Sequence, residues 1–141
     1  SILIVSGLSP YYLRLEENYQ FFGAEAFIEA PKDAKWNITF TEDARNIISE
    51  IDLNKSYALY SESPWSTPTG CIGIGQDVVV YATRAADGAA VVFSKPYFKG
   101  AVIFSGVRHH YASYARDYHL YLEFIQKLIE KARENTLFTK Q

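Results

Sequence analysis

Apolar residues occur along this chain in short runs, and their spacing predicts an alternation of strands and helices. Ile2 to Val5 form an uninterrupted apolar run, which is typical of a buried strand. The pattern then predicts a helix over 11–23 that ends at Gly23. Alternating apolar residues at 24–30 and an extended stretch at 35–40 indicate two short strands.

Two further helices are predicted from apolar residues at helical spacing. Residues 41–53 predict a short helix with Thr41 as its N-cap, and its apolar face consists of Ala44, Ile47, Ile48 and Ile51. A strand is expected at 56–60. Residues 111–134 predict a long amphipathic helix, whose apolar stripe consists of Ala115, Tyr118, Leu122, Ile125, Ile129 and Ala132.

Short β runs separated by turn residues fill the segment between these helices. The predicted strands are 71–75, 77–83, 89–94 and 101–106. Ala86-Asp87-Gly88 predicts a hairpin, because Asp and Gly tolerate positive φ. We therefore expect a single α/β domain over residues 1–141, with a mixed sheet and a hairpin-rich second half.

Composition narrows the class of protein. Apolar residues make up 48% and charged residues 21% of the chain, which is typical of a globular domain. The net charge of −2 argues against a nucleic-acid partner. No apolar run reaches the roughly 20 residues of a membrane span, so no membrane partner is expected.

The use of cysteine and methionine adds two expectations. The one cysteine, Cys71, has no partner for a disulfide within the chain, so we expect a reducing compartment, the cytoplasm. The chain contains no methionine, so it is either a processed chain or a fragment of a larger domain.

The stretch DVVVYATRAADGAAVVFSKPYFKGAVIFSGVRHHY resembles the closing part of class I glutamine amidotransferase-like domains. The similarity is to the type found at the N-terminus of biotin–protein ligases. Lys99-Gly100 stands for the family's glycine turn, Gly106 for a glycine after the last strand, and His109 for the family's histidine. The stretch ITFTEDARNIISEIDLNKSYALYSESPW is similar to the family's helix, strand and following loop. The resemblance covers most of this chain, but only the latter half of a typical family domain. It implies a flavodoxin-like, three-layer sandwich.

The resemblance also implies that two of the three catalytic positions have been lost. In the family, a cysteine at a strand-to-helix corner is the nucleophile, and a histidine oriented by a carboxylate activates it. Leu8 stands where the cysteine belongs, and Pro10 replaces a glycine. His110-Tyr111 replaces the Pro-Glu that follows the histidine. The chain is thus expected to be a pseudoenzyme that binds a small ligand or a protein partner.

The candidate binding site lies between two corners and a loop, because open α/β sheets bind ligands at the carboxyl ends of their strands. It consists of Ser6, Gly7, Ser9 and Tyr12 at the first corner, Trp65 in the loop, and Arg108, His109 and His110 after the last strand. Arg84 and Arg108 each follow a predicted strand and would supply positive charge there. No cofactor is expected. No metal site is expected either, because the histidines lack the i, i+4 spacing of zinc helices.

An enzyme is the first alternative. It would be a hydrolase or transferase in which His109 is the acid–base group, with Ser9 or Cys71 as the nucleophile. Against it, a serine before proline is an ordinary helix entry, and Cys71 is typical of a small buried hydrophobe.

A structural subunit is the second alternative. Aromatic residues make up 16% of the chain. Tyrosines recur at three- and four-residue spacing along the last helix, at Tyr111, Tyr114, Tyr118 and Tyr121. This face either packs on the sheet or contacts a second copy or another chain.

Overall fold

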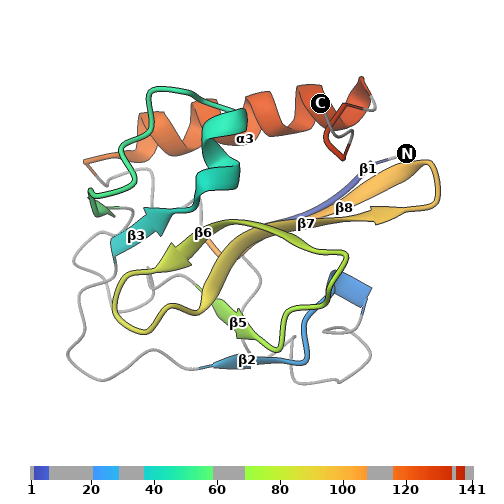
Figure 1. Ribbon diagram of the computed structural model, residues 1–141, viewed down its shortest axis with the longest axis horizontal. Helices are drawn as coiled ribbons and strands as arrows, with labels where there is room; N and C mark the ends of the chain where they lie inside the picture. Colours follow the sequence, from blue (N-terminus) through green and yellow to red (C-terminus); the bar gives the residue numbers. More distant parts are fainter. Residues whose placement is uncertain are drawn as a thin grey trace.

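The computed structural model describes residues 2–6, 21–28, 37–58, 69–107, 116–134 and 136–138, and of 2–6 it describes the backbone. Strands and one long helix dominate these residues (Figure 1). The strands are β1 (Ile2–Ser6), β2 (Ala26–Ile28), β3 (Asn37–Phe40), β4 (Tyr57–Ala58), β5 (Gly70–Ile72), β6 (Val79–Arg84), β7 (Ala90–Tyr97) and β8 (Gly100–Ser105). The helices are the 3-10 helix η2 (Glu42–Asn46) and the α-helix α3 (Tyr118–Arg133).

All eight of these strands belong to one sheet, in which six follow the order β1-β8-β7-β6-β3-β4. β2 pairs with β5, and β5 joins the sheet where Cys71 lies opposite Ala90. β1 runs parallel to β8, whereas the other pairings among the described strands are antiparallel. The expected mixed α/β fold is therefore confirmed. The sheet is mostly antiparallel, unlike the parallel sheet typical of flavodoxin-like domains.

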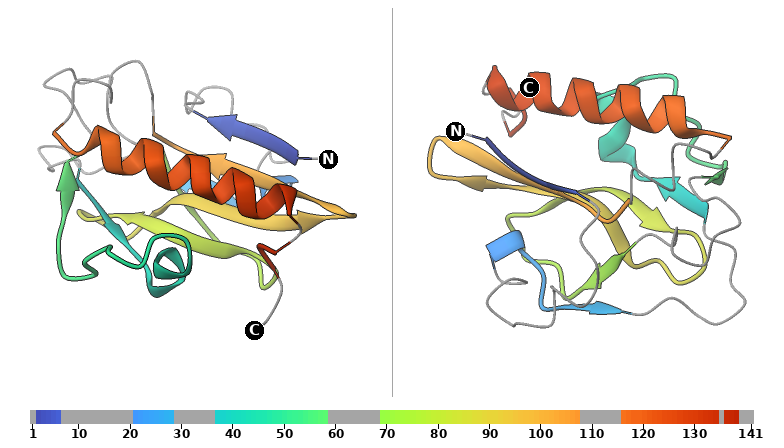
Figure 2. Two further views of the ribbon diagram at one scale, coloured as in Figure 1. Left: turned by 90° about the horizontal axis from the view of Figure 1, so that it is seen from above. Right: turned by 180° about the vertical axis from the view of Figure 1, so that it is seen from behind.

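Both faces of the sheet are covered, but by different kinds of element (Figures 1 and 2). α3 and η2 lie over one face, and the part of the same sheet formed by β2 and β5 turns over the other face. In β8, Ala101 and Ile103 belong to the core under α3. Val102 and Phe104 belong to the second core, on the side of β5. This double burial explains the uninterrupted apolar sequence of β8.

The helix predicted over 41–53 is much shorter than expected. Only η2 forms there, although the predicted apolar face is correct, since Ala44, Ile47, Ile48 and Ile51 are all buried. Thr41 is the N-cap residue, as predicted, but its hydroxyl does not cap the helix: it donates to the carbonyl of Val80 in β6, at 2.5 Å. β-branched isoleucines slightly disfavour an α-helix, and all three are buried without one, in the core cluster that also contains Tyr81 and Ala82 of β6.

The buried side of α3 is rotated relative to the predicted stripe. Tyr121, Phe124 and Leu128 are fully buried, whereas Leu122 and Ile129 are only half-buried. Ile125 and Ala132 are buried as predicted. The rotation arises because α3 contacts both β1 and β8, so a wider face than one stripe lies against the sheet.

The prediction that Tyr121 contacts a second subunit is wrong. This residue is 1% exposed, and its hydroxyl shares a hydrogen bond with the Ser105 hydroxyl at 2.5 Å. It therefore packs on the sheet, which was the other interpretation of the tyrosine face. Tyr118 is half-buried, and Tyr111 and Tyr114 lie outside the described residues.

The hairpin predicted at Ala86-Asp87-Gly88 joins β6 to β7, and an ion pair closes it. Gly88 has a φ of 75°, which a residue with a side chain rarely adopts. Arg84 donates from Nε to Asp87 Oδ1 at 3.0 Å and from Nη2 to Asp87 Oδ2 at 2.5 Å. Nη2 also donates to the carbonyl of Ile28 at 2.9 Å. One buried guanidinium thus links the hairpin to β2.

We predict that Asp87 makes the stability of the fold depend on pH. Burial alone would raise the pKa of this carboxyl, but hydrogen bonds from Arg84 and from the N–H of Ala89 outweigh burial and hold the pKa below its usual value of 3.8. A carboxyl with a lowered pKa stabilises the fold above the pKa of the unfolded chain. That stability is lost as the pH falls through the lower pKa of the folded state.

Asp87→Asn should therefore lower the free energy of unfolding at pH 7 by about 2–3 kcal/mol, because it removes the negative charge beside a buried guanidinium. Urea unfolding at several pH values measures this. The difference between variant and wild type should shrink below about pH 4. Asp77→Asn is the control, since Asp77 is exposed and its substitution should leave stability unchanged. A loss for Asp87→Asn that does not vary with pH would contradict the assignment.

Candidate functional site

The carboxyl ends of β1 and β8 lie side by side. The two strands are parallel, and Ser6 lies opposite Ser105. The chain after β1 and the chain after β8 therefore leave the same edge of the sheet. Gly7, Ser9, Tyr12, Trp65, Arg108, His109 and His110 lie outside the described residues, and of Ser6 only the backbone is described.

The end of β8 is held against the segment that enters β5. The N–H of Thr69 donates to the carbonyl of Gly106 at 2.9 Å, and the N–H of Gly106 donates to the carbonyl of Val91 at 2.7 Å. A Cβ atom on Gly106 would overlap the carbonyl of Thr69, so only glycine allows this approach. The loop containing Trp65 thus ends at the carboxyl end of β8.

The same loop begins at a second contact with the chain that follows β8. The N–H of Asp117 donates to the carbonyl of Ala58 at 3.1 Å, and the N–H of Ala58 donates to Asp117 Oδ2 at 2.7 Å. Residues 59–68 therefore run from the Ala58–Asp117 contact to the Thr69–Gly106 contact. The described residues that flank segments 59–68 and 108–115 therefore meet in two pairs, Ala58 with Asp117 and Thr69 with Gly106.

A hydroxyl pair fixes α3 to this edge of the sheet. Ser105 Oγ shares a hydrogen bond with the Tyr121 hydroxyl and accepts one from the N–H of Val107 at 3.3 Å. Ser105 and Val107 are both buried. The backbone is therefore fixed up to the residue that precedes Arg108.

Arg84 lies at this edge but does not offer a free charge. Its side chain is 1% exposed and forms the ion pair with Asp87. A Cβ atom on Gly70 would lie 2.9 Å from its Cζ atom, so the guanidinium covers that glycine. The expectation that Arg84 supplies positive charge to a ligand is therefore wrong, because Asp87 neutralises it.

Cys71 matches the description of a buried hydrophobe. It is 3% exposed, and burial raises the pKa of its thiol to about 12, although the positive charge of Arg84 acts in the opposite direction. The thiol is therefore protonated at neutral pH, whereas the thiolate is the nucleophilic form. Ser9 and His109, the other members of the enzyme alternative, lie outside the described residues.

Sequence reasoning missed the residues that position this edge. Asp117, Thr69 and Ser105 belong to no motif, and the hydrogen bonds that define their roles join distant parts of the chain. Within the described ranges, no three His, Cys, Asp or Glu side chains gather as metal ligands. The helices of the described part are too short or too polar to cross a membrane.

No family model, curated protein or solved structure matches this chain. The resemblance to amidotransferase-like domains therefore rests on the quoted motifs alone.

We predict that Gly106→Ala destabilises the protein through backbone overlap. The added methyl group meets the Thr69 carbonyl, so the free energy of unfolding should fall by about 3 kcal/mol. Gly88→Ala is the matched control: nothing lies within 4 Å of the added atom, and only its positive φ is unfavourable, at about 1 kcal/mol. Denaturant unfolding and hydrogen exchange at the Thr69 amide measure both effects. Equal losses in the two variants would contradict the close approach at Gly106.

We also predict that Asp117 holds the start of the Trp65 loop. Asp117→Ala removes the acceptor of the Ala58 N–H and should cost about 1–2 kcal/mol, whereas Asp117→Asn keeps an acceptor oxygen and should cost less than about 1 kcal/mol. Hydrogen exchange at the Ala58 amide should accelerate in the first variant only. Glu123→Ala is the control, because Glu123 forms an exposed pair with Lys127 on the same helix and should change stability by less than about 0.5 kcal/mol. Unchanged exchange at Ala58 in Asp117→Ala would show that the carboxylate does not hold this loop.

Proposed function

We propose that this chain is a non-catalytic, amidotransferase-like domain that binds a small ligand where β1 and β8 end. The ligand would lie between Ser6, Gly7, Ser9 and Tyr12, the loop with Trp65, and Arg108, His109 and His110. The observation that carries the proposal is the parallel pairing of β1 with β8, which sets Ser6 opposite Ser105. Ligands of open α/β sheets bind outside the carboxyl ends of such strands.

The shared anchors of the two candidate segments support this location. Segments 59–68 and 108–115 begin and end at the Ala58–Asp117 and Thr69–Gly106 contacts. A binding site gains affinity when its parts are fixed before the ligand arrives, because less ordering is needed on binding. The hydrogen bonds between the residues that flank the two segments would reduce this ordering.

The class of ligand follows from the charged residues of the candidate site. Arg108, His109 and His110 are consecutive, and each is a hydrogen-bond donor when it carries a proton. They favour a ligand with a carboxylate or phosphate group.

The absence of catalysis is proposed from three positions. Leu8 stands where the resemblance calls for a cysteine, and His110-Tyr111 lacks the carboxylate that would orient His109. Cys71 is buried and protonated, which makes it a poor substitute nucleophile.

The finer class of fold and the compartment belong to the same proposal. We propose a flavodoxin-like, three-layer arrangement on the basis of the parallel β1–β8 pair and of α3 over one face of the sheet; the antiparallel pairing of the other strands departs from it. The free thiol of Cys71 supports a cytoplasmic location.

A fragment screen by two-dimensional NMR tests the site. We expect acidic fragments to shift the amide signals of Ser6, Thr69, Ser105 and Gly106 more than neutral or basic fragments do, because the site favours anions. Gly106→Ala should abolish these shifts if it remains folded, and Gly88→Ala should keep them. Incubation with L-glutamine should release no ammonia above the blank. Fragment shifts elsewhere, no shifts at all, or ammonia release would contradict the proposal.

A further inference from the structure

The hairpin between β7 and β8 carries Phe98 at its tip, where both the exposure of the ring and the backbone conformation are unfavourable for a single chain. Phe98 is 91% exposed, and its φ of 53° lies in the left-handed region. Glycine at this position would remove both the exposed ring and the backbone strain. The tip projects beyond the rest of the sheet (Figure 1). It lies at the opposite ends of β7 and β8 from the candidate binding site, so the inference does not rest on the proposed function.

Phe98 is the outer end of a continuous series of ring contacts that begins in the core. Phe93 stacks on Phe104 at 4.8 Å between ring centres, and Phe104 contacts Phe22 at 5.5 Å. The series continues outward through Phe22–Phe21 at 5.5 Å, Phe21–Tyr97 at 5.5 Å and Tyr97–Phe98 at 4.7 Å. The outer three rings are partly or fully exposed, with Phe21 at 37% and Tyr97 at 46%. We call Phe21, Tyr97 and Phe98 the aromatic tip.

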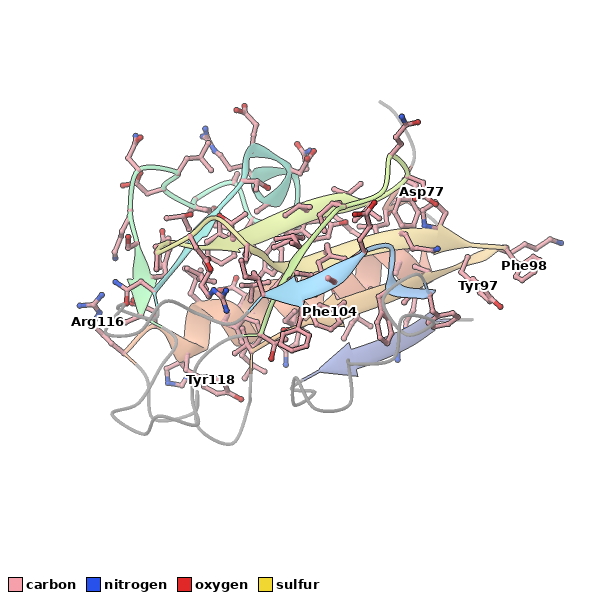
Figure 3. All side chains as sticks on the ribbon, turned by 90° about the horizontal axis from the view of Figure 1, so that it is seen from below. Asp77, Tyr97, Phe98, Phe104, Arg116 and Tyr118 are labelled. Carbon is pink, nitrogen blue, oxygen red and sulfur yellow. The ribbon has the colours of Figure 1, made fainter. Side chains whose placement is uncertain are left out.

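The charges around the aromatic tip have both signs. Lys95 and Lys99 flank Tyr97 and Phe98 in the sequence, and Asp77 is an exposed carboxylate at the same end of the molecule (Figure 3). An apolar centre with both charges at its rim is complementary to its own copy under a two-fold rotation, because Lys99 of one copy can face Asp77 of the other. A surface of one sign would favour a partner of opposite charge instead.

We propose that the aromatic tip is a contact surface at which two copies of this chain associate about a two-fold axis. Phe98 of each copy packs against Tyr97 and Phe21 of the other, which repeats the edge-to-face contacts already made within each chain. The association covers the exposed ring and so offsets the backbone strain at Phe98.

The area of the aromatic tip is small for a protein interface, which favours a weak contact. The exposed parts of the three rings amount to about 350 Å² per copy, since a whole aromatic side chain presents roughly 200 Å². Stable complexes bury about 800 Å² per partner. We therefore expect a weak dimer, with a dissociation constant on the order of 100 µM.

Sedimentation velocity from about 10 µM to about 1 mM tests the proposal, since this range spans the expected dissociation constant. The weight-average sedimentation coefficient of the wild type should rise with concentration. Phe98→Gly should remain monomeric throughout, while its melting temperature at low concentration rises by about 2–4 °C because the backbone strain is relieved. Phe98→Asn is a second variant with the same expectation, as asparagine also tolerates positive φ.

A matched control and a residue-level measurement complete the test. Ile72 is 46% exposed, as Tyr97 is, but lies on β5 away from the tip, so Ile72→Ser should associate like the wild type. Two-dimensional NMR of the wild type should show concentration-dependent shifts at residues 97–100. A wild type that is monomeric at 1 mM, association that survives both Phe98 variants, or concentration-dependent shifts confined to other residues would overturn the proposal.

Discussion

The close approach of two backbone segments at Gly106 is the constraint on which the carboxyl edge of the sheet depends. Through its N–H and its carbonyl, Gly106 bonds to Val91 in β7 on one side and to Thr69 on the other. Gly70, which follows Thr69 in the sequence, lies under the Arg84 guanidinium and beside Ala89. The backbone at Thr69 and Gly70 thus passes between the end of β8 and the hairpin that joins β6 to β7. It can do so because neither of the two glycines carries a side chain.

Much of the fold was predictable because its signals are local. The apolar sequence of β8 and the turn at Asp87-Gly88 predict strands and a hairpin, and both are present. The pairing of β1 with β8 was not predictable in the same way, since it joins the first strand to the last and no local pattern records it. The segment 41–53 shows the other limit: its periodic isoleucines predict the buried face, but not that the helix is only the five-residue η2, whose N-cap residue Thr41 bonds to β6.

The residues that hold the carboxyl edge of the sheet could not be predicted from the sequence. Asp117 lies inside the helix predicted over 111–134, yet it is the N-cap residue of α3, and its carboxylate accepts from Ala58 rather than from the first turn of α3. Arg84 was correctly expected near the edge where β8 ends, but its charge is paired with Asp87 in the adjoining turn. In both cases the residue type restricts the chemistry. The partner that fixes its role comes from the folded chain.

Hydropathy alone does not explain which aromatic residues are buried, because several tyrosines lie in the core while Phe98 lies at the surface. The buried tyrosines each have a polar partner: Tyr57 accepts from the N–H of Asp52, Tyr81 pairs with Ser94, and Tyr121 pairs with Ser105. Satisfied hydroxyls allow the rings to fill the core without an unpaired polar group. Phe98 has no hydroxyl to satisfy, and it is nevertheless the most exposed large apolar side chain in the described part of the chain. Burial of the tyrosines is thus explained by the folded chain itself, whereas exposure of Phe98 in a left-handed backbone is explained by a contact outside it.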